Sequence, residues 1–250
     1  MTFIFDPSHD GDNLKKLSTY FEKSYQIRSY DDTDIPTHGF YMGTIEGAHI
    51  IQKIRPNVKM FFSPERWACS IYYSYVNEKL LNDDHAFFSF HGIPHQKWDI
   101  YRWFGKECKV FIRPDSSEKV FPAQLIDIQD IDRFVEDHSD YEGLAVISTP
   151  KEIFGEWRFL IHKNYIKSVS SYRVLEYNTE VPSAPKKVRK FLDDFLIQTE
   201  IIEDVIYIDV ALQTNGECGI VEITPFSTAG MYKNDKLIIA QIIKELEYMA

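Results

Sequence analysis

Two acidic residues near the end of the chain lie on segments that have the pattern of a β-hairpin. Asp209 and Glu222 flank the dipeptide Asn215-Gly216, which favours a two-residue type I′ turn because that turn requires positive φ at both central residues. With the turn placed there, the two carboxylates face each other across the strands. Facing acids repel, so the pair indicates a bound cation, a protonated carboxyl or a solvated face. The register alone does not decide between a metal site and a solvated face.

The metal that such a pair of carboxylates suits is magnesium. Magnesium binds one or two carboxylates together with phosphate oxygens and water. The three cysteines are far apart and no CxxC or Cys/His ligand spacing occurs, so neither a zinc site nor a disulfide framework is expected.

Basic side chains that could bind phosphate groups flank a short polar loop in the middle of the chain. Arg113 ends one predicted strand and Lys119 begins the next. Arginine can bind a phosphate through two parallel hydrogen bonds and lysine adds a point charge, although solvated surface charges have the same pattern. The sequence contains neither GxxxxGK[ST] nor GxGxxG, which excludes a P-loop and the dinucleotide fingerprint.

A third polar set lies on a predicted strand whose other face is apolar. Glu156 and Arg158 alternate with Trp157 and Phe159, and the hairpin that they begin extends to Arg173. The polar face could pair Glu156 with Arg158, or it could present Arg158 to a phosphate group. For this segment taken alone, an ordinary exposed hairpin is the better interpretation.

The composition is that of a globular protein with an acidic surface. The chain has 250 residues, of which 44% are hydrophobic and 15% aromatic, enough for one large domain or two small ones. The formal net charge of −10 disfavours general binding to nucleic acids or anionic membranes. The N-terminal sequence lacks the signal-peptide pattern, and no apolar stretch approaches the roughly 20 residues of a membrane helix, so a soluble cytoplasmic protein is expected.

Helices and strands are predicted in mixed order, which indicates an α+β protein. The helices expected from apolar spacing and capping signals are residues 14–25, 67–81, 128–135, 187–199 and 236–248. The expected strands are residues 2–5, 58–62, 86–90, 110–113, 120–126 and 144–148, with hairpins over residues 156–173 and 205–224. Residues 91–94 are expected to form a loop, and the domain boundary is placed near residues 105–109.

Taken in order, these segments resemble the ATP-grasp superfamily, in particular the small bacterial and phage ATP-grasp domains in which an Arg-and-Lys set replaces the usual nucleotide-binding lysines. The resemblance extends from about residue 82 to the C-terminus and is carried by FIRPDSSEK, EWRFLI, SSYR, IDVAL and VEITPFSTAGMY. It implies an ATP-grasp fold in residues 109–250, with two α+β subdomains whose antiparallel sheets clasp ATP. A small α/β, pre-ATP-grasp-like region would precede it in residues 1–108.

The resemblance also implies roles for individual residues, each matched to a motif position. The implied nucleotide-binding residues are Arg113, Lys119, Glu156, Ser148 and Lys151 (the last two from a candidate adenine hinge), the implied catalytic residues are Arg158 and Arg173, and the implied magnesium ligands are Asp209, Glu222 and Thr224. Thr224 stands where the superfamily usually has asparagine. A hydroxyl in place of an amide oxygen implies a second metal site that is weaker or absent.

The function that the resemblance implies is a ligase that uses ATP and magnesium to join a carboxylate to an amine through an acyl phosphate. Its expected substrates are a small molecule or peptide with a carboxylate and an amine acceptor, with no nucleic-acid or membrane partner. The alternatives are an ATP-dependent phosphotransferase on the same scaffold and a catalytically inactive nucleotide-binding or interaction module. The oligomeric state is open, with a homodimer among the alternatives.

Overall fold

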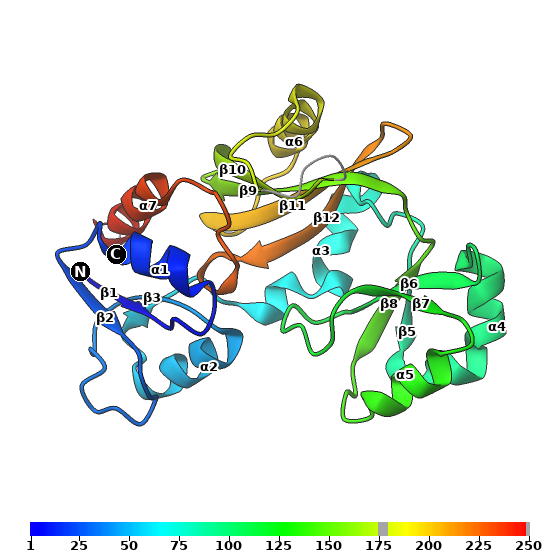
Figure 1. The fold of residues 1–250 in the computed structure, drawn as a ribbon, viewed down its shortest axis with the longest axis horizontal. Helices are drawn as coiled ribbons and strands as arrows, with labels where there is room; N and C mark the ends of the chain where they lie inside the picture. The colour runs from blue at the N-terminus through cyan, green and yellow to red at the C-terminus, as the bar shows by residue number, and fades with distance from the viewer. Residues whose placement is uncertain (175–179, 249–250) are drawn as a thin grey trace. The chain divides into compact units, whose positions relative to one another are not determined.

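Two compact units make up the chain, and each is assembled from separate segments of the sequence (Figure 1). The computed structural model describes residues 1–174 and 180–248. Unit 1 comprises Met1–Phe62, Gly155–Val210 and Glu222–Ala250, and unit 2 comprises Ser63–Phe154 and Ala211–Val221. The chain therefore passes between the units after residues 62, 154, 210 and 221. The predicted division into residues 1–108 and 109–250 stays a prediction.

A parallel four-stranded sheet occupies the N-terminal part of unit 1. Its order is β2-β1-β3-β4, with bounds Thr2–Phe5 (β1), Lys23–Gln26 (β2), Gly39–Met42 (β3) and Val58–Lys59 (β4). Phe3 and Phe5 share a hydrophobic cluster with α1 (Gly11–Ser18) and α7 (Lys236–Tyr248). Ile4, which points to the opposite face, belongs to a cluster with α2 (Ile45–Ile54). Helices therefore cover both faces of this sheet (Figure 1).

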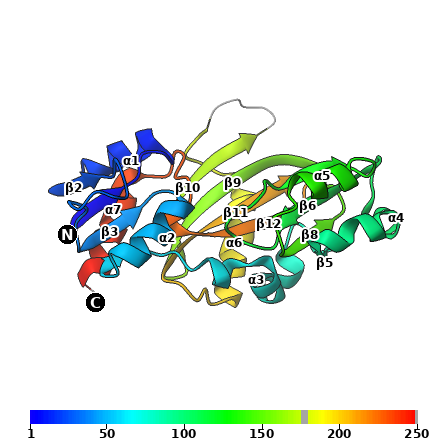
Figure 2. The same cartoon turned by 90° about the horizontal axis from the view of Figure 1, so that it is seen from below.

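A second four-stranded sheet contains both predicted hairpins. Figure 2 shows its strands side by side in the order β10-β9-β11-β12. Their bounds are Ile153–His162 (β9), Tyr165–Val174 (β10), Val205–Gln213 (β11) and Cys218–Pro225 (β12), and a short helix, η4 (Phe226–Thr228), follows. Helix α6 (Lys186–Gln198) contacts β10 and buries Val188 and Leu192. Residues 205–211 of β11 are all buried, so this inner strand is covered on both faces.

Unit 2 is built around an antiparallel sheet with the order β5-β8-β6-β7. Its strands are Ala86–Ser89 (β5), Lys109–Pro114 (β6), Gln124–Asp127 (β7) and Leu144–Ser148 (β8), and its helices are Pro64–Trp67 (η1), Cys69–Val76 (α3), Asn77–Lys79 (η2), Phe90–Gly92 (η3), Ile93–Phe104 (α4) and Ile131–Asp137 (α5). Ile112 and Ile147 of the sheet pack with Ile100 and Ile131 of α4 and α5. In the described part of the chain, no helix combines the length and the apolarity that a membrane span requires.

The predicted α+β class is confirmed, and strands β1 and β8 and helix α7 have the predicted bounds. The predicted helix 14–25 is wrong beyond Ser18, because residues 23–26 pair with β1 as a strand. The loop expected at residues 91–94 is also wrong. Pro94 lies in the first turn of α4, where proline is tolerated because the amide there has no helical acceptor. The predicted helix 67–81 is interrupted by the extended backbone of Ala68.

The turn between β11 and β12 has a different type from the one predicted. The Gly216 N–H donates to the Gln213 carbonyl oxygen at 2.9 Å, and the Gln213 N–H donates to that of Glu217 at 2.8 Å. Gly216 has φ = 89°, whereas Asn215 is not among the described residues with positive φ. The loop therefore has three residues, with glycine in the left-handed position. The two-residue type I′ prediction is wrong, and the pairing next to the turn is shifted by one residue.

Gly219 of β12 lies so close to Leu81 that no side chain fits between them. A Cβ atom on Gly219 would lie 2.5 Å from the Leu81 Cα and 2.7 Å from its backbone nitrogen. We expect Gly219→Ala to lower the free energy of unfolding by about 1–3 kcal/mol, because the backbone must move to make room. Urea unfolding measures the change. Gly11→Ala is the control, since the nearest atom to its added Cβ is 3.6 Å away; equal destabilisation of both variants would contradict the prediction.

Candidate functional site

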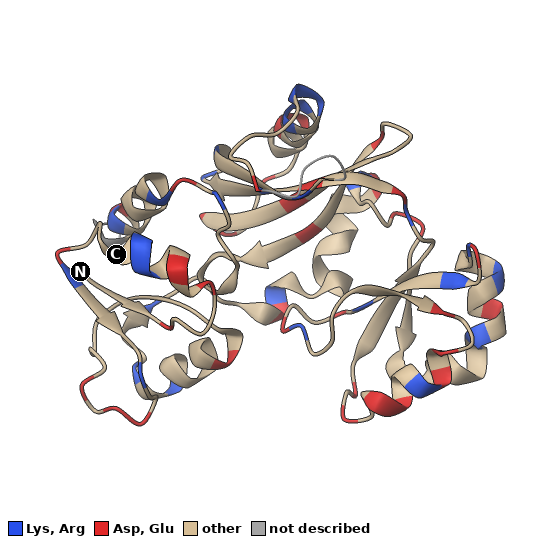
Figure 3. Cartoon of the chain, viewed as in Figure 1, with Lys and Arg blue, Asp and Glu red and all other residues tan. Residues whose placement is uncertain are grey.

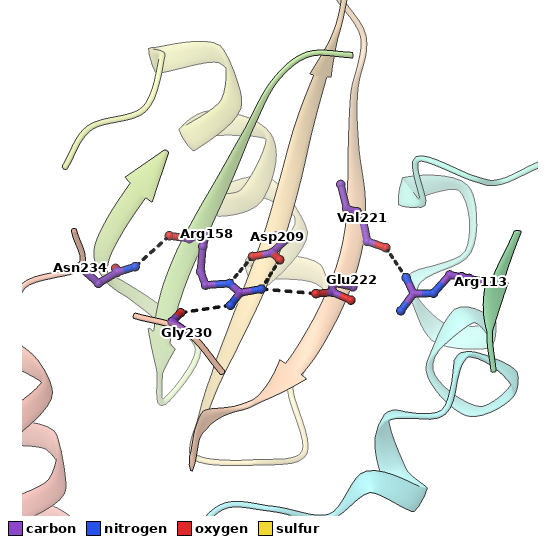
Figure 4. Close-up of polar contacts among 7 residues, drawn as sticks. All are labelled: Arg113, Arg158, Asp209, Val221, Glu222, Gly230 and Asn234. Carbon is purple, nitrogen blue, oxygen red and sulfur yellow. Dashed lines mark hydrogen bonds and ion pairs between the residues drawn. The ribbon is translucent and has the colours of Figure 1, made fainter. Parts of the chain in front are cut away.

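Arg158 on β9 is bonded to acidic residues on both of the next two strands of the sheet (Figure 4). Its Nε and Nη2 donate to the two carboxylate oxygens of Asp209 on β11 at 2.8 and 2.6 Å. Nη2 also donates to Oε1 of Glu222 on β12 at 3.3 Å. The two acids, whose proximity suggested a cation from the sequence, therefore contact one, and that cation is a guanidinium group.

This cluster is almost closed to solvent. Asp209 is 0% exposed, Arg158 is 3% exposed, and the side chain of Glu222 is 17% exposed. The solvated-face alternative is therefore wrong for Asp209. Residues 155–162 of β9 are all buried, so the exposed-hairpin interpretation is wrong for that strand. Burying these charges is tolerable because the arginine and the carboxylate form a two-bond, charge-assisted pair.

The loop that follows β12 holds Arg158 from another side. Nη1 of Arg158 donates to the Gly230 carbonyl oxygen at 3.1 Å, and Nδ2 of Asn234 donates to the Arg158 carbonyl oxygen at 3.3 Å. The guanidinium carbon lies 5.2 Å from the ring centre of Tyr232 and 5.8 Å from that of Tyr207, within cation–π range. Burial raises the pKa of both tyrosines, although the positive charge of Arg158 opposes the rise. Both rings are therefore neutral at physiological pH.

Glu156 lies two residues before Arg158 and is opposite Arg173 in the β9–β10 register. Nη1 of Arg173 lies 3.9 Å from Oε1 of Glu156. Glu156 is 6% exposed, but the Arg173 side chain is 70% exposed. An ion pair with one solvated partner contributes little stability, so Arg173 can leave Glu156 at small cost to bind a ligand.

In unit 2, Arg113 and Ser148 lie on the same face of the β6–β8 pair. Phe111 is opposite Ser148 and Arg113 is opposite Val146, and alternation turns these side chains away from the hydrophobic cluster of unit 2. Nη1 of Arg113 donates to the Val221 carbonyl oxygen at 3.0 Å (Figure 4). Ser148 is 0% exposed, and among the described residues its hydroxyl has no hydrogen-bond partner. A buried hydroxyl without a partner is costly, which favours a role in binding a ligand.

The two predicted lysines of unit 2 have different surroundings. Lys119 is exposed and has φ = 54° in the loop between β6 and β7. Lys151 follows β8, and its Nζ lies 3.0 Å from Asp84 Oδ1 and 4.0 Å from Asp83 Oδ1. It also lines a cavity of about 300 Å³ that Thr149 and Thr214 share. Lys151 thus has acidic partners of its own, whereas Lys119 is a solvated charge.

The densest basic run of the sequence does not belong to this site. Figure 3 shows its basic residues on helix α6. The run consists of Lys186, Lys187, Arg189 and Lys190, all exposed. Lys190 pairs with Asp194 one turn later at 2.7 Å. These residues form a solvated helix start.

Thr224 supplies a further oxygen next to Glu222. Two residues apart on β12, the two side chains point to the same side of the strand. Thr224 is 5% exposed, and its Oγ1 has no hydrogen-bond partner among the residues that the structure describes. A carboxylate with a hydroxyl oxygen fits magnesium. The described residues contain no group of three or more His, Cys, Asp or Glu side chains that could hold a metal, so an ion here would need ligands from a bound molecule or water.

The fold and this charged cluster define a member of the ATP-grasp superfamily. Residues 93–242 match a family described as an ATP-grasp domain, the second family of its clade, and the chain belongs to that family. Because the match covers more than half of the chain, the resemblance carried by the sequence motifs is confirmed. No match to the chain was found among curated protein sequences.

Three solved structures have the same fold over almost the whole chain. D-cycloserine synthetase DcsG is 10% identical with a TM-score of 0.70, and the similarity covers 98% of this chain and 99% of that one. D-alanyl-alanine synthetase A from Vibrio cholerae O1 biovar eltor is 9% identical with a TM-score of 0.66, covering 100% and 99%. The ATP-grasp ligase PsnB with a minimal precursor is 8% identical with a TM-score of 0.59, covering 98% of each chain. At these identities the similarity concerns the fold alone, and the predicted ATP-grasp fold is confirmed.

Proposed function

We propose that the protein is an ATP- and magnesium-dependent ligase that joins a carboxylate to an amine through an acyl phosphate. The observation that carries the proposal is the buried cluster of Arg158, Asp209 and Glu222 on the sheet of an ATP-grasp family member. Buried charged groups concentrate at functional sites because they are costly elsewhere. This cluster has the charge types that bind a polyphosphate and its metal ion.

The proposed reaction has two steps. An oxygen of the substrate carboxylate attacks the γ-phosphorus of ATP, the bond to the β–γ bridging oxygen breaks, and ADP leaves. The amine nitrogen then attacks the carbonyl carbon of the acyl phosphate, inorganic phosphate leaves, and the nitrogen loses a proton. Neither step forms a bond to the protein, so the side chains contribute position and charge.

The side chains of unit 1 have distinct proposed roles. Glu222 and Thr224 would hold magnesium, which when bound neutralises phosphate charge. Both oxygens of Asp209, predicted as a further metal ligand, accept hydrogen bonds from Arg158, so Asp209 would fix the guanidinium that stabilises the transferring phosphoryl group. The exposed Arg173 would bind the substrate carboxylate. The remaining proposed nucleotide-binding residues are Arg113, Lys119, Ser148, Lys151 and Glu156.

The proteins of similar structure support a small-molecule or peptide substrate. Two of them are named as synthetases, of D-cycloserine and of D-alanyl-alanine. PsnB is described as a ligase complexed with a minimal precursor, Mg and ADP. For this chain we therefore propose a substrate with a free carboxylate and a small amine or peptide amine as acceptor.

Calorimetric titration with ATP tests the nucleotide and metal parts of the proposal. We expect binding that requires magnesium in the wild type and is abolished in Glu222→Gln/Thr224→Val, which removes both proposed metal ligands. Circular dichroism confirms that each protein is folded. The absence of ATP binding by the folded wild type, with or without magnesium, would contradict the proposal and favour the inactive interaction module.

Hydroxylamine distinguishes a ligase from a phosphotransferase. As a small reactive amine it attacks an acyl phosphate and releases a hydroxamate, whereas a stable phosphorylated product does not react. With a panel of carboxylic acids and peptides, we expect ADP release accompanied by hydroxamate. ADP release with a stable phosphorylated product would instead identify a phosphotransferase.

A further inference from the structure

The carboxylates that the ATP-grasp resemblance assigns to magnesium are already neutralised in part by a cation of the protein itself. Arg158 donates two hydrogen bonds to Asp209 and a third to Glu222 (Figure 4). The distances, 2.8 and 2.6 Å to Asp209 and 3.3 Å to Glu222, show that the guanidinium belongs chiefly to Asp209. Glu222 is the more weakly bound and the more exposed of the two acids.

Arg158 is fixed where it lies by contacts beyond those with the acids. The Gly230 carbonyl accepts from Nη1 at 3.1 Å, and the rings of Tyr207 and Tyr232 lie against the guanidinium. Asn234 bonds to the backbone carbonyl of Arg158. A guanidinium held by a loop, two rings and a carboxylate is not free to move aside for an ion.

A second divalent ion at Asp209 would have to displace this guanidinium. Removing one partner from a buried ion pair reduces the relevant equilibrium constant by a factor of about 100–1,000 or more. An ion that binds there would lose affinity by about that factor. Glu222 with Thr224 has no such obstacle, since the Thr224 hydroxyl has no partner among the described residues and Glu222 holds Arg158 through one long bond.

We infer that Arg158 takes the place of a second magnesium ion, so that this chain binds ATP with one divalent ion, held at Glu222 and Thr224. The inference rests on the proposed function, because it concerns the metal content of the same nucleotide site. Asp209 then acts as a positioning residue for a permanent cation. The amide oxygen that Thr224 lacks is not needed, because the ion it would serve is replaced.

Counting bound Mn²⁺ in place of Mg²⁺ tests the inference without any turnover. The protein is saturated with a non-hydrolysable ATP analogue, and Mn²⁺ is titrated while the free ion is followed by electron paramagnetic resonance. We expect one Mn²⁺ per bound nucleotide in the wild type. Two ions per bound nucleotide would overturn the inference and leave the proposed function intact, whereas failure of the folded protein to bind the nucleotide would overturn the proposed function itself.

Variants locate the effect at Arg158. In Arg158→Gln the carboxylates are released, and we expect a second Mn²⁺ to bind. In Arg158→Gln/Asp209→Asn the second ligand is removed as well, and the count returns to one. Arg133→Gln, on an exposed arginine of α5, is the matched control and keeps one ion. A count of one in folded Arg158→Gln would overturn the assignment to Arg158; if that variant does not fold, the wild-type count still decides the inference.

Discussion

Replacing Arg158 with alanine is expected to lower the free energy of unfolding by about 3–5 kcal/mol. The loss is large because Asp209, which is 0% exposed, would remain buried without the two charge-assisted hydrogen bonds it accepts from Arg158. Urea unfolding measures the change, and the buried Trp157, next to Arg158 on β9, provides the fluorescence signal.

A double variant separates the ion pair from simple loss of packing. Arg158→Met/Asp209→Leu leaves neither charge buried, so we expect it to be markedly more stable than the single variant. Arg133→Ala is the surface control, since the Arg133 side chain is 83% exposed, and its effect should lie within about 0.5 kcal/mol of zero. A single-variant effect as small as that of the surface control would mean that the buried pair is not needed for folding.

Replacing Glu222 with glutamine is expected to reduce the turnover number for ATP by about 100-fold. The amide keeps the shape of the side chain but removes the negative charge that binds magnesium. A metal ion contributes several kcal/mol of charge stabilisation to the transition state, and each 1.4 kcal/mol is about a factor of ten in rate. ADP release at saturating ATP measures the loss.

Stability should change much less than turnover in this variant, because the Glu222 bond to Arg158 is long, at 3.3 Å. Glu200→Gln, on an exposed acid after α6, is the control and should retain wild-type turnover. If turnover falls only in proportion to the amount of folded protein, Glu222 has a structural role and the metal assignment is wrong.

Local patterns in the sequence identified elements whose residues decide their own structure. Strand β8 and helix α7 were predicted with their observed bounds, since a short apolar run and a long apolar stripe are unambiguous. Residues 23–26 were predicted as helix, yet they form β2 because β1 offers them a partner. That partner lies about twenty residues away in the sequence, where no local pattern reports it.

The candidate site shows the same limit more sharply. The sequence singled out Asp209, Glu222 and Arg158 separately, but alternation along one strand cannot show that β9 lies beside β11. The acids were therefore expected to need an external cation, and the internal one was missed. The loop residues Gly230 and Asn234, which hold Arg158, were not predicted either. They lie outside any strand or helix, and only the motif VEITPFSTAGMY, which includes Gly230, drew attention to that segment.

The interleaving of the two units has a consequence for synthesis on the ribosome. Phe3 and Phe5 emerge first, but they share their core with Tyr207, Phe226 and α7, which are translated last. At about 5–20 residues per second, the apolar face of the first sheet waits on the order of ten seconds or more for its cover. The nascent chain is most exposed to aggregation in that interval, so translation rate and chaperone access are expected to govern the yield of folded protein.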